Sequence, residues 1–540
     1  MFTLKTLSGR PQHPAVDELC DSYRGGHIGR RDFLRTAAWL GVSAASAAAF
    51  AGSGTGSAAA TETPKRGGSL RFACQIQEMH DPAESNWFEA ANVFRNVLEY
   101  LTRVDANNIV HPYLAASWDP SPDLKTWTFH LQPNVKWSNG DAFTSEDVAT
   151  NLRRWIAPDS KSSNKTSFAA LRDIEILGPM ELRLHLDRPM LALPEMLYAP
   201  NTPIMHRDFG TSGTDWTKNP IGTGPYRLTE FQVGQKATLT RRAEYWGEAP
   251  YLDEIRFIDL GTDISTHLAA LAARQVDILY RINVADLDLA KRLPDVQILR
   301  VRAAQTPVMR MQVDQKPFDD IRVRQAVVLA CDNSRFLDIA IRGAGVLGEN
   351  CHVAPFQPEY APVAAPKRDL ERAKHLLREA GYANGLDLSI AVGNTQGVWE
   401  QNTAQVLQSQ CADANIRVKL NIMPASQYWP IWNKVPFGLT YWAHRPLAVQ
   451  TLDLAYRSGA AWNETHFADP KFDAALDVAM GIIDPKARSV AMAPVEKILQ
   501  DAALMVQPFW MNKYTAVSSR VRGYILPPNE SFELFKTWIA

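Results

Sequence analysis

The sequence predicts an α/β protein with more than one domain, because strand-like and helix-like segments alternate along a chain of 540 residues. Residues 181–186 place apolar side chains at every second position, whereas residues 370–380 place them three or four positions apart. Alternation of the two patterns is typical of sheets whose faces are covered by helices. A chain of this length can bury two or three separate cores.

The first half of the chain is dominated by short strands. We expect them at residues 69–74, 126–131, 181–186, 237–242, 254–260, 277–282 and 296–301. Thr144 and Asp147 form a capping-box pattern, which predicts a helix at residues 148–155. A second helix is expected at residues 267–274.

The pattern changes near Thr306, after which longer helices predominate. We expect helices at residues 322–330, 370–380, 402–414, 471–483 and 488–504, and strands at 386–392, 417–423 and 438–442. From Gln507 to the last residue the chain is again aromatic and strand-like. These two changes indicate boundaries between domains.

The N-terminal residues have the pattern of an export signal. Arg30 and Arg31 precede a stretch rich in Ala, Gly and Ser that is too short and too weakly apolar to span a membrane, which takes about 20 strongly apolar residues. Paired arginines before such a stretch are typical of twin-arginine signals, which direct folded proteins across the bacterial inner membrane. We therefore expect residues 1–60 to be removed, with cleavage after Ala51 as the alternative, and the product to be free in the periplasm.

Charge and cysteine content narrow the class of protein. The formal net charge is −1 and no basic block is present, which argues against a nucleic-acid partner. Cys20 lies in the expected signal, whereas Cys74, Cys331, Cys351 and Cys411 follow it without a C-x-x-C pair. An even number of cysteines in an oxidising compartment permits disulfides, and buried free thiols are an equally good interpretation. Cys331–Cys351 is the one pairing singled out for a test.

The sequence contains no recognisable pattern of catalytic or metal-binding residues. It has no H-E-x-x-H, no Walker loop and no G-x-S-x-G, and its histidines lack the spacing of metal ligands. The adjacent carboxylates Asp319 and Asp320 are better explained as surface or helix-capping groups than as a glycosidase pair. We expect a binding protein without a cofactor or metal, and not an enzyme.

Several segments resemble, in order, the family 5 extracellular solute-binding proteins, which are periplasmic receptors of peptide and nickel ABC importers. They include a Gly-Thr-Gly-Pro-Tyr turn at residues 222–226 and a turn with a capped helix at residues 135–148. The set comprises residues 97–104, 112–118, 123–132, 135–148, 220–226, 245–247, 251–255, 276–278 and 320–326. Each segment is a weak signal, but the ordered set covers nearly all of residues 67–540.

The resemblance implies a two-lobed periplasmic-binding-protein clamp of type II, with an extra subdomain in the first lobe. Lobe I would comprise residues 61–303 and 508–540, with the subdomain at about 112–219, and lobe II residues 304–507. Crossings near 304–307 and 507–509 would form the hinge, in agreement with the changes of pattern at Thr306 and Gln507. The ligand would bind between the lobes and hold them closed. The closed protein, a monomer, would then dock on the transmembrane subunits of an ABC permease.

The segment 441–446 is the most informative about the ligand. In dipeptide-binding relatives the corresponding strand end carries an aspartate that pairs with the N-terminal ammonium of the peptide, and here His444 takes that place beside Arg445. A buried ammonium without a counter-ion is costly, whereas Arg is suited to bidentate binding of carboxylate or phosphate. We therefore expect an anionic or N-substituted ligand, such as an opine-type sugar–amino-acid conjugate or a modified peptide, rather than a plain dipeptide.

Aromatic and polar residues are the expected wall of the ligand site. The candidate set is Trp87, Trp399, Tyr441, Trp442, His444, Arg445, Trp462 and Asn463. The resemblance places the loop 79–87 at the cleft, and Trp442 is the best of the tryptophans because it lies next to His444. Burial in a core is the competing explanation for each tryptophan, and a position facing solvent is the competing one for Arg445.

Three other functions stay open on the sequence alone. In the nickel-binding branch of the family, His80, His444 and His466 could contribute to a metal-chelate site, since imidazole suits nickel. A secreted hydrolase would need a nucleophile or metal site that the sequence does not display. A chaperone-like peptide binder would have broad, weak affinity and no defined cleft.

Overall fold

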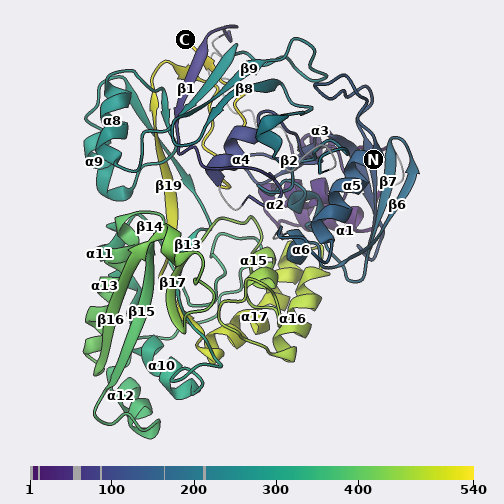
Figure 1. The fold of residues 1–540 in the computed structure, drawn as a ribbon. Helices are drawn as coiled ribbons and strands as arrows, with labels where there is room; N and C mark the ends of the chain where they lie inside the picture. The colour runs from purple at the N-terminus through teal and green to yellow at the C-terminus, as the bar shows by residue number, and fades with distance from the viewer. Residues whose placement is uncertain (1–3, 10–11, 53–62, 86–87, 163, 211–214) are drawn as a thin grey trace. The chain divides into compact units, whose positions relative to one another are not determined.

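The structure is a computed structural model that describes residues 4–9, 12–52, 63–85, 88–162, 164–210 and 215–540 (Figure 1). The chain forms two compact units. Unit 1 comprises Met1–Ile282, Asp286–Val301 and Tyr514–Ala540, and unit 2 comprises Asn283–Ala285 and Arg302–Lys513. The sequence predicts divisions after residues 303 and 507. The second division lies further along the chain because β19 (Phe509–Ser518) is one continuous strand that begins in unit 2 and ends in unit 1.

Unit 1 is built on a mixed sheet in the order β12-β19-β11-β1-β10-β9-β8 (Figure 1). Its other strands are β1 (Ser69–Ala73), β8 (Tyr226–Gln232), β9 (Lys236–Arg241), β10 (Glu254–Ile258), β11 (Ile278–Leu279) and β12 (Val296–Arg302). Strand β1 is parallel to β10 and β11 and pairs Phe72 with Phe257. The ring of Phe72 lies 5.6 Å from that of Phe257 and 5.3 Å from that of Phe532, in the core of the unit.

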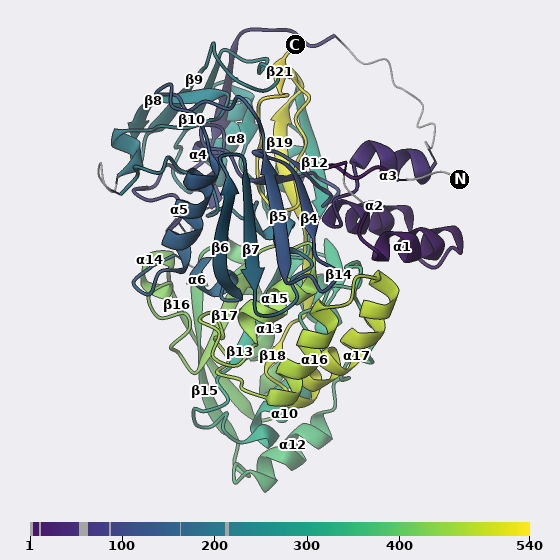
Figure 2. The ribbon, with the colours of Figure 1, turned by 90° about the vertical axis from the view of Figure 1, so that its right-hand side faces the viewer.

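The segment for which the sequence predicts an extra subdomain contains an antiparallel sheet in the order β4-β5-β7-β6 (Figure 2). Its strands are β4 (Ala115–Pro120), β5 (Thr126–Leu131), β6 (Leu171–Gly178) and β7 (Glu181–Leu186). Helix α5 (Ser145–Ile156) begins at the predicted capping box, where the backbone N–H of Thr144 donates to the Asp147 carboxylate at 2.8 Å. The predicted strands 126–131 and 181–186 and the predicted helix are confirmed.

Short elements complete unit 1. The helices are α4 (Phe88–Phe94), α6 (Asn164–Ser167), α7 (Leu193–Met196), η1 (Trp216–Lys218), α8 (Ile264–Ala272) and α9 (Leu287–Ala290), and the strands are β2 (Thr102–Val104), β3 (Val110–Pro112), β20 (Val521–Arg522) and β21 (Trp538–Ile539). The short helix η2 (Val284–Asp286) begins in unit 2 and ends in unit 1. Near them a buried carboxylate, Glu99, accepts hydrogen bonds from the Tyr245 hydroxyl at 2.7 Å and the Trp246 indole at 2.8 Å. These two hydrogen bonds link the segment 97–104 to the segment 245–247. Both segments are among those in which the sequence resembles the family 5 solute-binding proteins.

Unit 2 has its own sheet in the order β16-β15-β17-β13-β18, with helices packed against it (Figure 1). The strands are β13 (Thr306–Met311), β15 (Leu386–Asn394), β16 (Ile416–Pro424), β17 (Phe437–Trp442) and β18 (Met505–Val506), and β14 (Gly345–Leu347) pairs with β19. The helices are α10 (Ile321–Leu329), α11 (Asn333–Ile341), α12 (Leu370–Glu379), α13 (Val398–Ala412), α14 (Ala425–Tyr428), α15 (Ala448–Ala455), α16 (Pro470–Met480) and α17 (Pro485–Ala502). Strand β15 is parallel to β16 and β17, whereas β13 is antiparallel to both of its neighbours.

Three helices lie within the residues that the sequence assigns to a removable signal. They are α1 (Ala15–Arg24), α2 (Arg30–Trp39) and α3 (Ala44–Phe50), and they belong to unit 1. Phe33 and Trp39 are both 0% exposed, so the segment is packed and not an open chain. No helix in the described part of the chain is long and apolar enough to cross a membrane.

All five cysteines are buried and unbridged. The thiol of Cys331 contacts that of Cys411 in the core of unit 2. Cys351 lies elsewhere, with its Sγ 3.5 Å from a carboxylate oxygen of Glu496 on α17. The pairing of Cys331 with Cys351 is therefore wrong, because each thiol faces a different neighbour.

Glu496 is a fully buried carboxyl of unit 2. One of its oxygens accepts the backbone N–H of Ala361 at 2.8 Å, and the other receives the Cys351 thiol. Burial raises the pKa of Glu496 to about 8. The folded protein therefore holds this proton at pH values where the unfolded chain, with an ordinary pKa of 4.5, has released it.

We predict that Glu496 destabilises the fold as pH rises from about 4.5 to 8. The folded state binds more protons than the unfolded state in this window, so stability falls by at most about 1.4 kcal/mol per pH unit. Glu496→Gln carries no titrating group and should gain stability relative to the native protein with rising pH. Urea unfolding at pH 5, 7 and 8.5 measures the difference.

The control is Glu371→Gln, which removes a carboxyl that is 87% exposed on α12. Its stability relative to the native protein should stay nearly constant over the same pH range. A flat difference between Glu496→Gln and the native protein would contradict the assignment of a buried, protonated carboxyl.

Candidate site of solute binding

Three of the predicted site residues gather in unit 2, where β17 ends. The rings of Trp442 and Trp462 meet edge to face with centroids 5.9 Å apart. The guanidinium carbon of Arg445 lies 5.7 Å from the Trp442 ring and 5.9 Å from the Trp462 ring. Both separations are within the range of cation–π attraction, so the two indoles hold the arginine in place. We call these three residues the Trp–Arg cluster.

A buried ion pair between Glu464 and Arg310 holds the Trp–Arg cluster in place. Glu464 is 2% exposed, and its carboxylate accepts the Trp442 indole N–H at 2.7 Å, the Thr440 hydroxyl at 2.6 Å and the Nε of Arg310 at 2.8 Å. Arg310 is 0% exposed and also donates to the carbonyl oxygen of Val435 at 2.6 Å. Both charges are thus neutralised and hydrogen-bonded, as burial requires.

Further aromatic rings continue the cluster in both directions. Trp462 contacts Trp432 at 6.0 Å, and Trp432 contacts Trp429 at 6.3 Å; these three rings are all partly exposed. On the inner side, the buried Trp442 contacts the imidazole of His352 at 5.4 Å. The rings therefore form an aromatic series that runs from the interior of unit 2 to its surface.

The electrostatics of the cluster are dominated by Arg445. Its side chain is partly buried, and burial lowers the pKa of its guanidinium to about 10, so the group stays cationic at neutral pH. Burial, together with the charge of Arg445, lowers the pKa of His352 to about 3, so this imidazole is neutral. Among the described residues, no carboxylate lies within ion-pair distance of the Arg445 guanidinium, which instead makes cation–π contacts with the two neutral indole rings.

The other predicted site residues use their side chains inside unit 2. The Nδ1 of His444 accepts the backbone N–H of Ala304 at 2.8 Å, and the Tyr441 hydroxyl donates to the Gln305 side chain at 2.8 Å. Asn463 donates to the carbonyl oxygen of Phe467 at 2.6 Å. Trp399 is 6% exposed and packs on Tyr441 within the core of the unit.

These contacts favour structural roles for His444, Asn463 and Trp399. That these residues contact the ligand stays a prediction. Trp87, the remaining member of the predicted set, lies outside the described residues. The Trp–Arg cluster is thus the part of the predicted set that the structure brings together. Its cation, the Arg445 guanidinium, has no acid partner among the described residues.

Four residues important to the cluster are missed by the sequence-based reasoning: Arg310, Trp429, Trp432 and Glu464. A signal for Arg310 exists, since it is the one charged residue of β13, whose residues are all buried. Gly438 is a second signal, because a Cβ at this position would lie 2.9 Å from an Arg310 nitrogen. Glu464 could not be found from sequence, since its partners are far from it along the chain.

The histidines proposed for a metal chelate have separate partners. His80, in unit 1, contacts Glu78 and Asp215. His466, in unit 2, contacts Asp314 at 2.9 Å, and His444 binds a backbone N–H. Within the described ranges no group of three or more His, Cys, Asp or Glu side chains is arranged to hold a metal ion.

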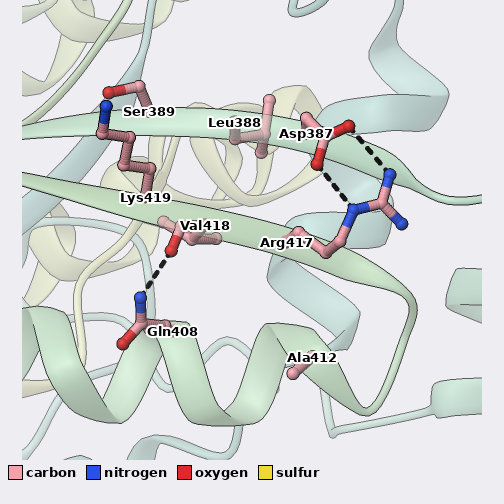
Figure 3. Close-up of a pocket in the computed structure, with 8 residues that line it drawn as sticks. All are labelled: Asp387, Leu388, Ser389, Gln408, Ala412, Arg417, Val418 and Lys419. Carbon is pink, nitrogen blue, oxygen red and sulfur yellow. Dashed lines mark hydrogen bonds and ion pairs between the residues drawn. The ribbon is translucent and has the colours of Figure 1, made fainter.

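A separate open groove of about 630 Å³ lies along β15 and β16 (Figure 3). Its lining residues are Asp387, Leu388, Ser389, Gln408, Ala412, Arg417, Val418 and Lys419. Asp387 and Arg417 form an exposed bidentate ion pair, and Gln408 donates to the Val418 carbonyl oxygen at 2.7 Å. None of these residues belongs to the Trp–Arg cluster.

Two α/β units, each built on a mixed sheet, with a further antiparallel sheet in unit 1, fit the class of the solute-binding proteins. Residues 110–461 match the model of the bacterial extracellular solute-binding proteins, family 5 (middle region). The chain belongs to this family, and it is the substrate-binding component of an ABC importer.

Relatives with known names agree with this assignment. The chain is 25% identical over 452 residues to the heme-binding protein A of Haemophilus influenzae, covering 78% of this chain and 82% of that protein. It is 24% identical over 473 residues to the glutathione-binding protein GsiB of Salmonella typhi, covering 84% and 90% of the two chains.

Solved structures of the family share the fold. DppA from Helicobacter pylori, in complex with the peptide STSA, superposes with a TM-score of 0.78 at 22% identity, covering 88% of this chain and 98% of that one. AgaA from A. tumefaciens R10, in complex with agropinic acid, superposes with a TM-score of 0.77 at 25% identity, covering 88% and 99%. The two-lobed α/β fold class is thereby confirmed.

We predict that Glu464→Gln destabilises unit 2 by roughly 3 kcal/mol, because it leaves Arg310 charged, buried and without its counter-ion. Urea unfolding followed by tryptophan fluorescence measures the loss. The matched control is Asp387→Asn, which breaks the solvent-exposed pair with Arg417 and should cost far less stability than Glu464→Gln. Equal small losses in both variants would show that the buried pair does not hold the cluster.

Proposed function

We propose that this protein captures a peptide-like or amino-acid-conjugate solute bearing an acidic group, and that Arg445 binds this group. The observation that carries the proposal is a guanidinium stacked on two indoles and, among the described residues, without an acid partner. Family members bind diverse solutes, so the ligand class must come from the chemistry of the site and not from the fold.

The physical argument concerns the free energy of a partly buried cation. Arg445 is partly buried, so its guanidinium has lost part of its hydration, and no carboxylate among the described residues compensates for the loss. A carboxylate or phosphate of a ligand would restore the lost interactions through two parallel N–H···O bonds. An ammonium placed at the same position would be repelled, which disfavours an unmodified peptide N-terminus there.

The cation–π contacts strengthen this expectation. Trp442 is fixed by Glu464 and Trp462 packs on Trp442, so the plane on which Arg445 rests is rigid before a ligand arrives. A preorganised guanidinium loses little conformational entropy on binding, which favours affinity for a planar acid. Partly exposed rings nearby offer an apolar wall for the rest of the solute.

Two of the relatives bind small polar solutes of this kind, whereas the relative from Haemophilus influenzae binds heme. One binds agropinic acid, another glutathione and a third a peptide, as their names state. We infer from the first two that an acidic conjugate is within the range of this family. The solute would be delivered to the transmembrane subunits of the permease without a bond being made or broken, and we expect the receptor to act as a monomer.

For the location of the protein, we infer export to the periplasm by the twin-arginine pathway. The support is Arg30 and Arg31 followed by an uncharged stretch, together with membership of a family of extracellular solute-binding proteins. Replacing both arginines by lysine should abolish accumulation of the protein in the periplasmic fraction.

We predict that agropinic acid or glutathione raises the melting temperature of the native protein and that Arg445→Gln abolishes the shift. At a hundred times its dissociation constant a ligand stabilises the fold by about 2.7 kcal/mol, which is readily detected by thermal unfolding. The dipeptide Met-Leu serves as the plain-peptide comparison in the same assay.

The matched control variant is Arg302→Gln. Arg302 is also stacked on a ring of unit 2, with its guanidinium carbon 5.4 Å from the centroid of the Phe356 ring. The Arg302→Gln variant should leave the ligand-induced shift in melting temperature unchanged. A shift with Met-Leu alone, unaffected by Arg445→Gln, would retain the receptor function and contradict the acidic ligand.

A further inference from the structure

Two cysteines of unit 2 face each other in its core, although they are far apart in the sequence. Cys331 lies in the junction between α10 and α11, and Cys411 lies in the last turn of α13. Their thiols are in contact, and the two residues are 4% and 0% exposed. Both belong to one hydrophobic core, which contains residues of the helices and of the sheet. The fold thus brings together two thiols that no spacing in the sequence connects.

The residues next to the two cysteines are tied together by a pair of hydrogen bonds. The side-chain oxygen of Gln410 accepts the backbone N–H of Asp332 at 2.8 Å, and its amide nitrogen donates to the Asp332 carbonyl oxygen at 3.3 Å. Gln410 is 2% exposed, so both bonds are shielded from competition by water. Because Gln410 precedes Cys411 and Asp332 follows Cys331, these bonds fix one backbone segment against the other beside the thiols.

A second link joins the same two segments through the residues on the opposite flanks of the cysteines. The Nε of Arg368 donates to the carbonyl oxygen of Ala330 at 2.9 Å, and its Nη2 donates to the Asp413 carboxylate at 2.5 Å. Ala330 precedes Cys331, and Asp413 lies two positions after Cys411. The two thiols are therefore held face to face by links that begin on both flanks of each cysteine.

The surroundings of two other buried cysteines are different. Cys74 in unit 1 lies near the carboxylates of Glu89 and Asp259, and the Cys351 thiol donates to Glu496. A disulfide requires two sulfur atoms that can approach to bonding distance without movement of the backbone. In the described part of the chain, the contact between Cys331 and Cys411 is the arrangement that meets this requirement most directly.

We propose that Cys331 and Cys411 are a redox pair that closes to a disulfide once the protein is in the oxidising periplasm. The proposal rests on the export route proposed above, because thiols stay reduced in a reducing cytoplasm. Closure would join the α10–α11 junction covalently to the end of α13, around a loop that contains β14, α12 and β15. A cross-link around a long loop stabilises a fold mainly by restricting the unfolded chain.

The reaction is an exchange with an external disulfide, such as that of an oxidised dithiol protein or of oxidised glutathione. One cysteine thiolate attacks a sulfur of the external disulfide, whose S–S bond breaks and releases one thiolate. The second cysteine attacks the mixed disulfide, so that the bond between Cys331 and Cys411 forms and the other half of the oxidant leaves as a thiolate. The two cysteines are oxidised, the external disulfide is reduced, and the two cysteine protons pass to the released thiolates.

The environment of Cys331 slows this reaction in the closed core. Its hydrogen bond with Cys411 and its burial raise the pKa of the Cys331 thiol well above the ordinary value. The thiolate is the attacking species, so the reaction requires a local opening that exposes the last turn of α13. We therefore expect closure to accelerate in urea at concentrations too low to unfold the protein.

The test uses the full-length protein, purified under reducing conditions and then treated with oxidised glutathione in a low concentration of urea. Thiols titrated after complete unfolding should fall by two per molecule, and a digest without reductant should contain a peptide pair that links Cys331 to Cys411. The urea midpoint of the oxidised protein should lie above that of the same protein after reduction with dithiothreitol. An unchanged thiol count, or a pair formed through Cys351, would overturn the proposal.

The matched control is Cys351→Ala, which also removes a fully buried thiol from unit 2. This variant should still lose two thiols on oxidation and keep the shift of the urea midpoint, whereas Cys411→Ala should show neither effect. A shift that persists in Cys411→Ala would contradict the assignment. The comparison of oxidised with reduced native protein needs no variant, so it decides the question even if Cys411→Ala fails to fold.

Protein recovered from the periplasmic fraction separates this proposal from the export route. Alkylation during lysis should leave Cys331 and Cys411 unmodified, because they are joined to each other, and should modify Cys351 after unfolding. Modified Cys331 and Cys411 in periplasmic protein would overturn closure after export and retain the export route. If the protein does not reach the periplasmic fraction, the export route and closure in the cell are both overturned, and the oxidation in vitro still decides whether the two thiols form a pair.

Discussion

The buried pair of Arg310 and Glu464 is the constraint on which the Trp–Arg cluster of unit 2 depends. Two charges removed from water must be fully hydrogen-bonded, so each position around them is fixed. Glu464 binds Trp442 and Thr440 on β17, and Arg310 holds the chain at Val435 before that strand. The pair therefore joins β13, β17 and the loop that carries Trp462 into one rigid surface.

This arrangement separates the two roles that charge plays in the unit. The carboxylate of Glu464 is fully engaged by internal hydrogen bonds, whereas the guanidinium of Arg445 lies over two indole rings and has no acid partner among the described residues. Rigidity comes from the first group, and the affinity for an acid that we propose would come from the second. A solute-binding protein needs both, since a surface that is fixed in advance spends little of its binding free energy on ordering itself.

The sequence predicts those parts of the molecule that depend on local pattern. Alternation identified β5 and β7, and a capping box located the start of α5. It could not predict that Glu464 would meet Arg310, which is a tertiary pairing across 154 positions. It also missed the docking of α1 to α3, because the segment is assigned to a signal that would be removed and its partner, Trp118, is supplied by another part of the chain.

The most direct measurement is the mass of the solute that remains bound when the native protein is purified from the periplasm and then denatured. Mass spectrometry of the released fraction should detect an amino-acid conjugate or modified peptide with an acidic group besides any free C-terminus, and Arg445→Gln should release none. Release of an unmodified neutral dipeptide or of a nickel complex, from the native protein and the variant alike, would contradict the role assigned to Arg445.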